Sequence, residues 1–251
     1  MKVTGEYTLL FADDDIVVVN KKSGLLVAAD KYDTESPRLD LIAQKKLGTL
    51  LSVHRIDKDA SGVVIYARNK NAAEFLIKQF EENKARYVYH ALVYGSVMWK
   101  KESVNVKLLA DGGKDHKTTA NAKYGKHCQT HFTNLGSCSL YSWIEAIPEV
   151  DRVHQIRVHL QSLSQNVVCD NLYSGYTKAV YLSDIKRAWR GDEEKERPLL
   201  SRLALHAYSL TIKHPVTAKD MTFVAPYHKD MDATRKQLEK LFSIDPLAPR
   251  N

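Results

Sequence analysis

The segment 53–62 constrains the fold most, because it places charged and turn-forming residues between two apolar runs. The run that follows it, 63–67, has the length and composition of a buried β-strand. Gly62 can adopt a positive φ angle where the loop meets this strand. We therefore expect a loop that holds Arg55 and Asp57 rigidly at the surface. On its own, this Arg-x-Asp triplet is more typical of a connecting loop with a surface ion pair than of a catalytic carboxylate.

The composition is that of a globular, basic protein. Of the 251 residues, 44% are hydrophobic, which is enough for a substantial core, and we expect a single domain over residues 1–251. There is no run of 18 or more apolar residues and no basic-apolar leader, so we expect a soluble chain that is not exported. The net charge of +7 favours a polyanionic partner such as RNA.

The cysteines argue against a disulfide framework. The 3 cysteines are odd in number and form no Cys-x-x-Cys pair, so a Cys-based zinc motif is also absent from the sequence. A reducing cytoplasm fits this pattern best, and we expect a cytoplasmic protein.

Hydrophobic periodicity and punctuation by Gly, Pro and Asn predict strands mixed with short helices. Ser36 with Pro37 predicts the start of a helix and Gly48 its end, while Asn71 is expected to cap the next helix. Strands are expected at 7–11, 16–20, 63–67, 86–95, 129–133, 138–147 and 203–212, and helices at 37–47, 71–80, 152–163 and 232–242.

Two polar segments read as excursions from this framework. Residues 110–127 are expected to form a mobile loop whose lysines suit phosphate contacts or only solubility, and residues 176–202 a long charged excursion. The phosphate candidates in the first excursion are Lys114, Lys117, Lys123 and Lys126.

Two patterns resemble metal sites without satisfying their geometry. The acids 13–15 follow one another at a turn, so they cannot all face one ion, and we expect a solvated turn. His154 and His159 are separated by five positions on a predicted helix and therefore face different sides, unlike a His-x-x-x-His zinc pair. We expect no metal site.

The strand 86–95 and the helix 152–163 carry the other candidate site residues. Alternation puts Tyr87 and Tyr89 on one side of the strand, where their rings fit either core packing or a ligand. The helix has an apolar seam, and Arg157 flanks that seam closely enough to reach into a cleft.

Several motifs together resemble the RluA-like pseudouridine synthases, which isomerise uridine in tRNA and rRNA. Residues 54–62 resemble the family's HRLDxxTSG motif, and residues 152–160 resemble GRxHQIRxHL. Further matches follow in the same order over about residues 7–227: Asn20-Lys21 with Ser23-Gly24, the strand residues Tyr89, Ala91, Val93 and Gly95, then Asp170 and Tyr173, and Leu205-His206-Ala207 with His214-Pro215. Such ordered agreement is far more specific than any one motif.

The chain also departs from the family pattern. Most notably, Tyr87 stands where a lysine is common. The other departures are Lys22, Ile56, Ala60, Asp151, Asn166 and Cys169. No S4-like RNA-binding domain fits before residue 7, so the resemblance is closest to the catalytic-domain-only, TruC-like members.

The resemblance implies an α+β fold, with a mixed, largely antiparallel sheet and flanking helices around a basic cleft. It implies Asp57 as the catalytic aspartate, which must be ionised. Arg157 is then the guanidinium that favours its charged form, and Tyr89 stacks on the flipped base and can assist proton transfer. No cofactor is required.

The remaining expected contacts are with RNA and with the pocket wall. The expected RNA contacts are Lys21, His54, Arg55, Arg152, His154 and Gln155, and Leu160 and Leu205 are expected to wall the pocket. We expect a monomer that acts on tRNA or rRNA and has no membrane or metal partner. A catalytically idle RNA-binding or RNA-folding protein on the same scaffold is the alternative, and a metal-dependent hydrolase is a weaker one.

Overall fold

The computed structural model describes residues 5–110 and 117–249. They form two compact units, and the chain passes between them more than once. The first unit comprises Met1–Tyr89 and His206–Pro226, and the second comprises His90–Leu205 and Tyr227–Asn251. Whether the two units act as one catalytic domain stays a prediction.

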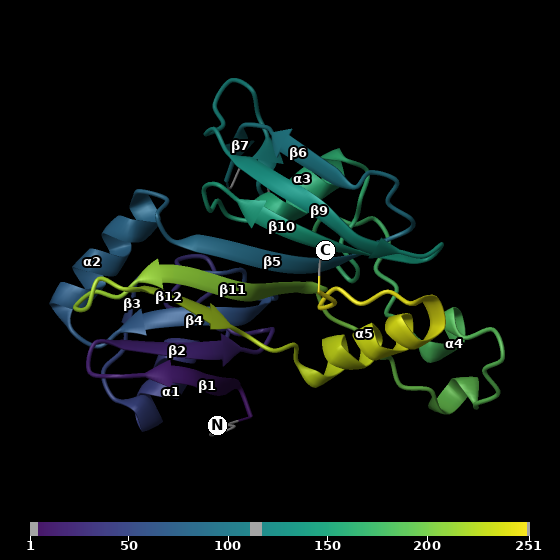
Figure 1. The fold of residues 1–251 in the computed structure, drawn as a ribbon, viewed down its shortest axis with the longest axis horizontal. Helices are drawn as coiled ribbons and strands as arrows, with labels where there is room; N and C mark the ends of the chain where they lie inside the picture. The colour runs from purple at the N-terminus through teal and green to yellow at the C-terminus, as the bar shows by residue number, and fades with distance from the viewer. Residues whose placement is uncertain (1–4, 111–116, 250–251) are drawn as a thin grey trace. The chain divides into compact units, whose positions relative to one another are not determined.

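The sheet of the first unit has the strand order β1-β2-β4-β11, with β3 added to β4 and β12 to β11 (Figure 1). All residues of β2 and β4 are buried, which explains the continuous apolar runs 16–19 and 63–67 within them. The pairing of β4 with β11 is parallel, and the others are antiparallel. The strands are β1 (Tyr7–Ala12), β2 (Ile16–Lys21), β3 (Leu51–Ser52), β4 (Ser61–Ala67), β11 (Leu205–Lys213) and β12 (Asp220–Val224).

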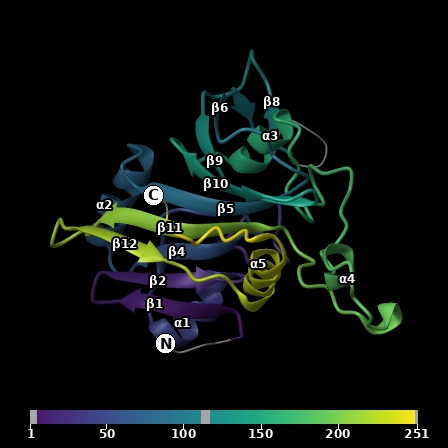
Figure 2. The ribbon, with the colours of Figure 1, turned by 45° about the vertical axis from the view of Figure 1, so that its right-hand side comes forward.

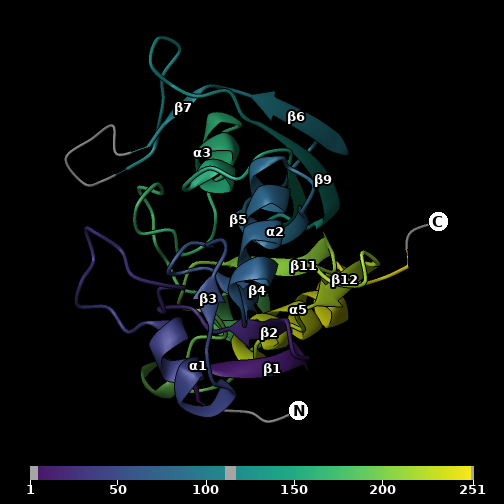
Figure 3. The same cartoon turned by 90° about the vertical axis from the view of Figure 1, so that its left-hand side faces the viewer.

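Helix α2 (Lys70–Glu81) packs against β4 with one apolar face (Figure 3). Asn69, and not the predicted Asn71, caps it, because the Asn69 side chain accepts the N–H of Ala72 at 2.9 Å. Leu76 is fully buried, whereas Phe75 is 37% exposed and lies outside the buried face.

Helix α1 (Leu39–Leu47) begins two residues later than predicted. The Ser36 hydroxyl donates to Asp33 Oδ2 at 2.7 Å instead of capping the helix. The predicted end is confirmed, since Gly48 has φ +77 and its N–H donates to the Gln44 carbonyl at 3.1 Å.

The second unit contains an antiparallel arrangement of β10, β9 and β6. Helix α3 (Gln155–Ser162) packs on β9 and β10 and starts later than predicted, because His154 before it is left-handed with φ +55. The strands are β5 (Arg86–Tyr94), shared by the two units, β6 (Lys101–Asn105), β9 (Gln129–Ser137) and β10 (Tyr141–Pro148). The prediction of an α+β fold with a mixed, mostly antiparallel sheet is confirmed.

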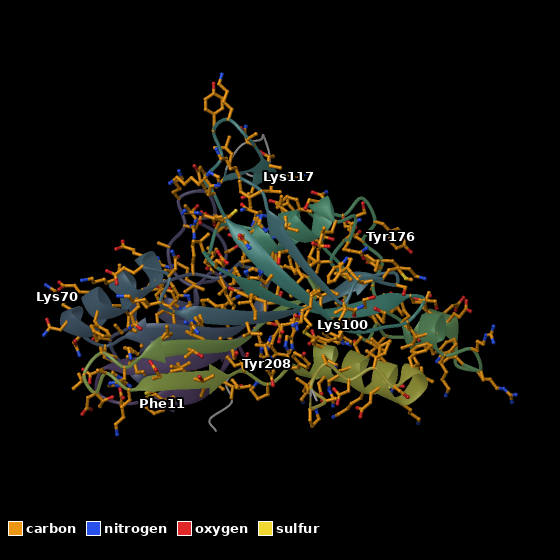
Figure 4. The ribbon with its side chains drawn as sticks, turned by 45° about the horizontal axis from the view of Figure 1, so that its top comes forward. Phe11, Lys70, Lys100, Lys117, Tyr176 and Tyr208 are labelled. Atoms are coloured by element: carbon orange, nitrogen blue, oxygen red, sulfur yellow. The ribbon has the colours of Figure 1, made fainter. Side chains whose placement is uncertain are left out.

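The two predicted excursions contain some regular structure. Strand β7 (Leu108–Leu109), just before the first excursion, pairs with β8 (Thr119–Ala120) within it, while Lys114 lies outside the described residues. Lys117, labelled in Figure 4, lies shortly before β8. The second holds α4 (Leu182–Ile185) and the 3₁₀ turn Glu193–Lys195 within long connections (Figure 2).

The C-terminal helix α5 (Lys229–Phe242) confirms the helix predicted from residue 232 and begins three residues earlier. Across residues 5–110 and 117–249, no helix is long and apolar enough to cross a membrane.

Candidate active site

Asp57 lies half-buried on the loop that joins β3 to β4, as the sequence predicted. Its carbonyl accepts the N–H of Ala60 at 3.2 Å, which tightens the loop into a turn before β4. Arg55 on the same loop is exposed. The loop therefore presents a carboxylate and a cation on a short backbone segment next to a fully buried strand.

Lys21 fixes the end of this loop from the neighbouring strand β2. The side chain is 0% exposed, and Nζ donates to the carbonyls of Ala60 at 2.7 Å, Lys58 at 2.8 Å, Leu25 at 2.9 Å and Lys22 at 3.1 Å. A buried ammonium needs such acceptors to offset its desolvation. The predicted RNA contact of Lys21 does not fit this burial, and we assign the residue a structural role.

His54 fixes the beginning of the loop. Its Nε2 accepts the N–H of Ile65 at 3.0 Å, and Nδ1 lies 2.7 Å from the hydroxyl of Tyr87. Phe80 stacks on the imidazole at a centroid distance of 4.7 Å. Burial lowers the pKa of His54 to about 3, so the ring is neutral at physiological pH. A neutral ring with both nitrogens engaged does not fit the predicted RNA contact.

Tyr89 occupies β5 and is only 4% exposed. Its ring lies 5.3 Å from that of Tyr87, two residues before it on the same strand. This spacing confirms that the two side chains share one face of the strand. Asp57 and Tyr89 both belong to the first unit.

Arg157 lies on α3 in the second unit and is 5% exposed. The guanidinium makes two parallel hydrogen bonds to Asp170, from Nε to Oδ2 at 2.8 Å and from a terminal nitrogen to Oδ1 at 2.6 Å. It also lies over the ring of Tyr173, 4.9 Å from the centroid. This bidentate and stacked arrangement fixes the plane of the guanidinium. That Arg157 meets Asp57 and Tyr89 stays a prediction.

Asp170 and Tyr173 are positioned to support Arg157, although sequence reasoning did not name them as site residues. Asp170 Oδ1 also accepts the backbone N–H of Tyr173 at 3.1 Å, which holds the carboxylate in place. The Tyr173 hydroxyl accepts the N–H of Thr118 at 2.8 Å and lies 2.8 Å from His154 Nδ1. Their match to the family pattern was the signal available in the sequence.

The residues at the start of α3 that were predicted to contact RNA differ in their exposure to solvent. Arg152 is exposed and available to a phosphate, and His154 is half-buried. Gln155 is 2% exposed, and its amide nitrogen donates to the Gln129 carbonyl at 3.0 Å and to Thr130 Oγ1 at 2.9 Å. The predicted RNA contact of Gln155 does not fit, because its amide joins the helix to β9.

Leu160 and Leu205, the predicted pocket walls, are 0% and 3% exposed. This burial fits an apolar wall and equally a core position. Their role in a pocket stays a prediction.

Asp13, Asp15 and His214 form a cluster in which one candidate ligand atom from each lies within 4.8 Å of the others. His214 Nδ1 accepts the N–H groups of Val216 and Thr217, both at 3.2 Å, so Nε2 carries the proton and donates to Asp13 Oδ2 at 2.8 Å. Although burial alone would raise it, backbone N–H groups and His214 lower the pKa of Asp13. Hydrogen bonds account for this cluster without an ion.

The motif residues after the loop serve the parallel pairing of β4 with β11. Ser61 Oγ donates to His206 Nδ1 at 2.8 Å, because His206 Nε2 donates to the Ala225 carbonyl at 2.9 Å. Two sequence motifs far apart in the chain are thus joined directly behind the loop that carries Asp57.

The family model for RNA pseudouridylate synthases matches residues 15–162, a span that contains Asp57, Tyr89 and Arg157. The chain belongs to this family. The RluA-like resemblance is confirmed, and the protein is an isomerase that acts on RNA.

Two relatives illustrate the similarity. An RNA pseudouridine synthase of Chlorobaculum parvum is 31% identical over 94% of this chain and 75% of its own length. The dual-specificity RNA pseudouridine synthase RluA of Escherichia coli is 30% identical over 87% of this chain and 92% of its own. The TruC-like subtype stays a prediction.

The fold is shared with solved structures. Human RNA pseudouridylate synthase domain containing 4 superposes with a TM-score of 0.70 at 21% identity, covering 92% of each chain. Human RNA pseudouridylate synthase domain containing 1 gives 0.69, also at 21% identity, over 93% of this chain and 90% of its own. At such identities these structures show the fold alone.

Proposed function

We propose that this pseudouridine synthase modifies specific uridines of tRNA or rRNA, with Asp57 as its catalytic carboxylate. The observation that carries this proposal is the Asp57 loop itself, whose two ends are fixed by His54 and Lys21. A catalytic carboxylate requires such fixed placement. The dual specificity named for the 30% identical Escherichia coli relative supports tRNA and rRNA as the substrate classes.

The reaction breaks the C1′–N1 bond of uridine and forms a C1′–C5 bond, while a proton leaves C5 and N1 gains one. Atoms and electrons balance without net oxidation or hydrolysis, so the step requires no redox partner. Asp57 supplies the ionised oxygen that acts on the sugar or the base. The target nucleotide must leave the RNA stack before the base can turn.

Tyr89 and Arg157 complete the proposed chemistry. Tyr89 offers a ring on which a flipped base can stack and a hydroxyl for proton transfer. A guanidinium near Asp57 would favour the ionised carboxylate despite partial burial. The Asp170 pair keeps Arg157 in one orientation, as that role requires.

Exposed cations are proposed to contact the RNA backbone. Arg55 and Arg152 are exposed, as are Lys123 and Lys126 in the excursion after β8. Contacts of this kind supply affinity and do not read sequence.

The test is to map pseudouridine in total RNA from cells with and without the gene, and then to restore wild type or Asp57→Asn. We expect at least one site to vanish on deletion and to return only with wild type. Asp57→Asn should still bind the RNA that carries the site. Restoration by Asp57→Asn would reject Asp57 as the catalytic group, and loss of no site would support the idle RNA-binding alternative.

A further inference from the structure

We propose that Tyr87 is a positioning residue for the isomerisation, because it holds His54 at the start of the Asp57 loop and packs against Tyr89. The inference rests on the proposed function of Asp57 and Tyr89. Tyr87 is 3% exposed, so its ring is held within the first unit. Position 87 is also one of the departures from the family pattern found in the sequence.

Hydrogen-bond accounting assigns the direction of the contact between Tyr87 and His54. The N–H of Ile65 donates to His54 Nε2 at 3.0 Å, so that nitrogen presents its lone pair. A neutral imidazole then carries its proton on Nδ1, which donates to the Tyr87 hydroxyl at 2.7 Å, a shorter distance than the 3.2 Å from that hydroxyl to Nε2. A lysine ammonium has no lone pair to accept this proton, so lysine at position 87 could not make the same contact.

Phe80 prevents the imidazole from turning away from these partners. Its ring, from α2, stacks on His54 with centroids 4.7 Å apart and an interplanar angle of 25°. The His54 ring is thus held by β4, by Phe80 and by Tyr87. His54 lies three residues before Asp57, so a shift of its ring would be passed to the backbone of the loop.

Tyr87 also contacts the second residue proposed for catalysis. The rings of Tyr87 and Tyr89 lie 5.3 Å apart with an interplanar angle of 37°. Tyr87 therefore lies between the loop that carries Asp57 and the ring proposed to stack on the flipped base. Its hydroxyl need not touch the RNA to affect the rate, because a small misplacement of reacting groups lowers the rate steeply.

The test compares Tyr87→Phe with Tyr66→Phe under single-turnover and steady-state conditions. Tyr66 is a matched control, since its buried hydroxyl donates to the Val27 carbonyl at 2.7 Å in the same unit. We expect Tyr87→Phe to lower kcat about tenfold with KM for RNA unchanged, the effect of one lost hydrogen bond that orients reacting groups. Tyr66→Phe should keep kcat within about twofold while losing similar stability.

A double variant tests whether Tyr87 acts through His54. If it does, Tyr87→Phe combined with His54→Asn should lower kcat no further than His54→Asn alone. A wild-type kcat in Tyr87→Phe, an equal loss in Tyr66→Phe, or fully additive losses in the double variant would each overturn the proposal. An active Asp57→Asn protein would instead reject the proposed function, so the two failures are distinguishable.

Discussion

Gly62 passes so close to Ala207 that a Cβ atom added to it would lie 2.3 Å from the Ala207 carbonyl oxygen. The two residues are register partners in the parallel pairing of β4 and β11, and Gly62 has φ +121. Both the backbone angle and the close approach require glycine. The Ser-Gly motif after the Asp57 loop therefore serves strand pairing directly behind the candidate site.

Gly62→Ala is expected to lower the free energy of unfolding by about 3 kcal/mol or more, since strain at positive φ adds to a backbone clash. Urea unfolding measures this loss. Gly24→Ala is the matched control, because Gly24 also has a positive φ, +85, but no atom lies within 4 Å of an added Cβ. Its cost should be about 1 kcal/mol, the backbone contribution alone. Equal losses in the two variants would contradict the close approach.

Lys21→Met should destabilise the protein by about 3 kcal/mol, because four backbone carbonyls lose a charged donor. It should also lower kcat, since two of those carbonyls, of Lys58 and Ala60, end the Asp57 loop. Lys22→Met, at the exposed neighbouring position, should change neither quantity. If Lys21→Met instead weakened RNA binding in a folded, stable protein, the earlier prediction of an RNA contact would be restored.

Arg152→Ala tests the proposed phosphate contacts. Because each phosphate contact releases counterions, the slope of log affinity against log salt should fall in magnitude by about one. Filter binding of the target RNA at several salt concentrations measures the slope. The control is Lys70→Ala, at an exposed position at the start of α2 (Figure 4), which should leave the slope unchanged. Equal slopes for wild type and Arg152→Ala would remove Arg152 from the interface.

Regular elements were predictable because periodicity reflects burial. The alternation over 86–95 and the apolar run 63–67 correspond to β5 and β4. Helix starts were less predictable. Ser36 and Asn71 are residue types that commonly cap helices, but whether such a side chain caps a helix depends on the hydrogen-bond partners it has in the folded protein. Ser36 bonds Asp33, and Asn69 was closer to the true start of α2.

The site residues were predictable by type more than by partner. A lysine in a cationic turn has the same sequence signal whether its side chain faces RNA or four backbone carbonyls. The sequence therefore predicted an RNA contact for Lys21, whose ammonium is instead bonded to four carbonyls. An RNA contact was also predicted for Gln155, whose amide nitrogen instead donates to two groups on β9. The contact of Arg157 with Asp170 depends on the tertiary fold, and its only signal in the sequence was the match of Asp170 to the family pattern.

Asp170→Asn should lower kcat about 10- to 100-fold while the affinity for RNA changes little, since a neutral amide cannot hold the Arg157 guanidinium by two charged bonds. Steady-state kinetics on the target RNA separates the two quantities. Asp230→Asn is a matched control in the same unit, because Asp230 also binds an arginine, Arg202, by two bonds of 2.6 and 2.9 Å. It should lose stability without loss of kcat. A wild-type kcat in Asp170→Asn would show that Arg157 needs no such support.

His54 should make the folded state less stable in mild acid. Its pKa is about 3 in the folded protein, because burial disfavours the charged ring, against 6.5 for an unperturbed histidine. Above pH 6.5 neither state binds the proton and the stability is complete. Below pH 6.5 His54 binds a proton in the unfolded chain but not in the folded chain, so the free energy of unfolding falls as the pH is lowered toward 3.

Between pH 7.5 and 5.0 this difference amounts to about 2 kcal/mol. The comparison is the urea unfolding free energy of wild type and His54→Asn at both pH values, since asparagine does not titrate and the contributions of all other groups, including the buried His159, cancel. Wild type should lose about 2 kcal/mol more than the variant over this interval. Parallel losses would show that His54 becomes protonated in the folded protein, and the hydrogen bond that its Nε2 accepts from the Ile65 N–H would then have to be reassigned.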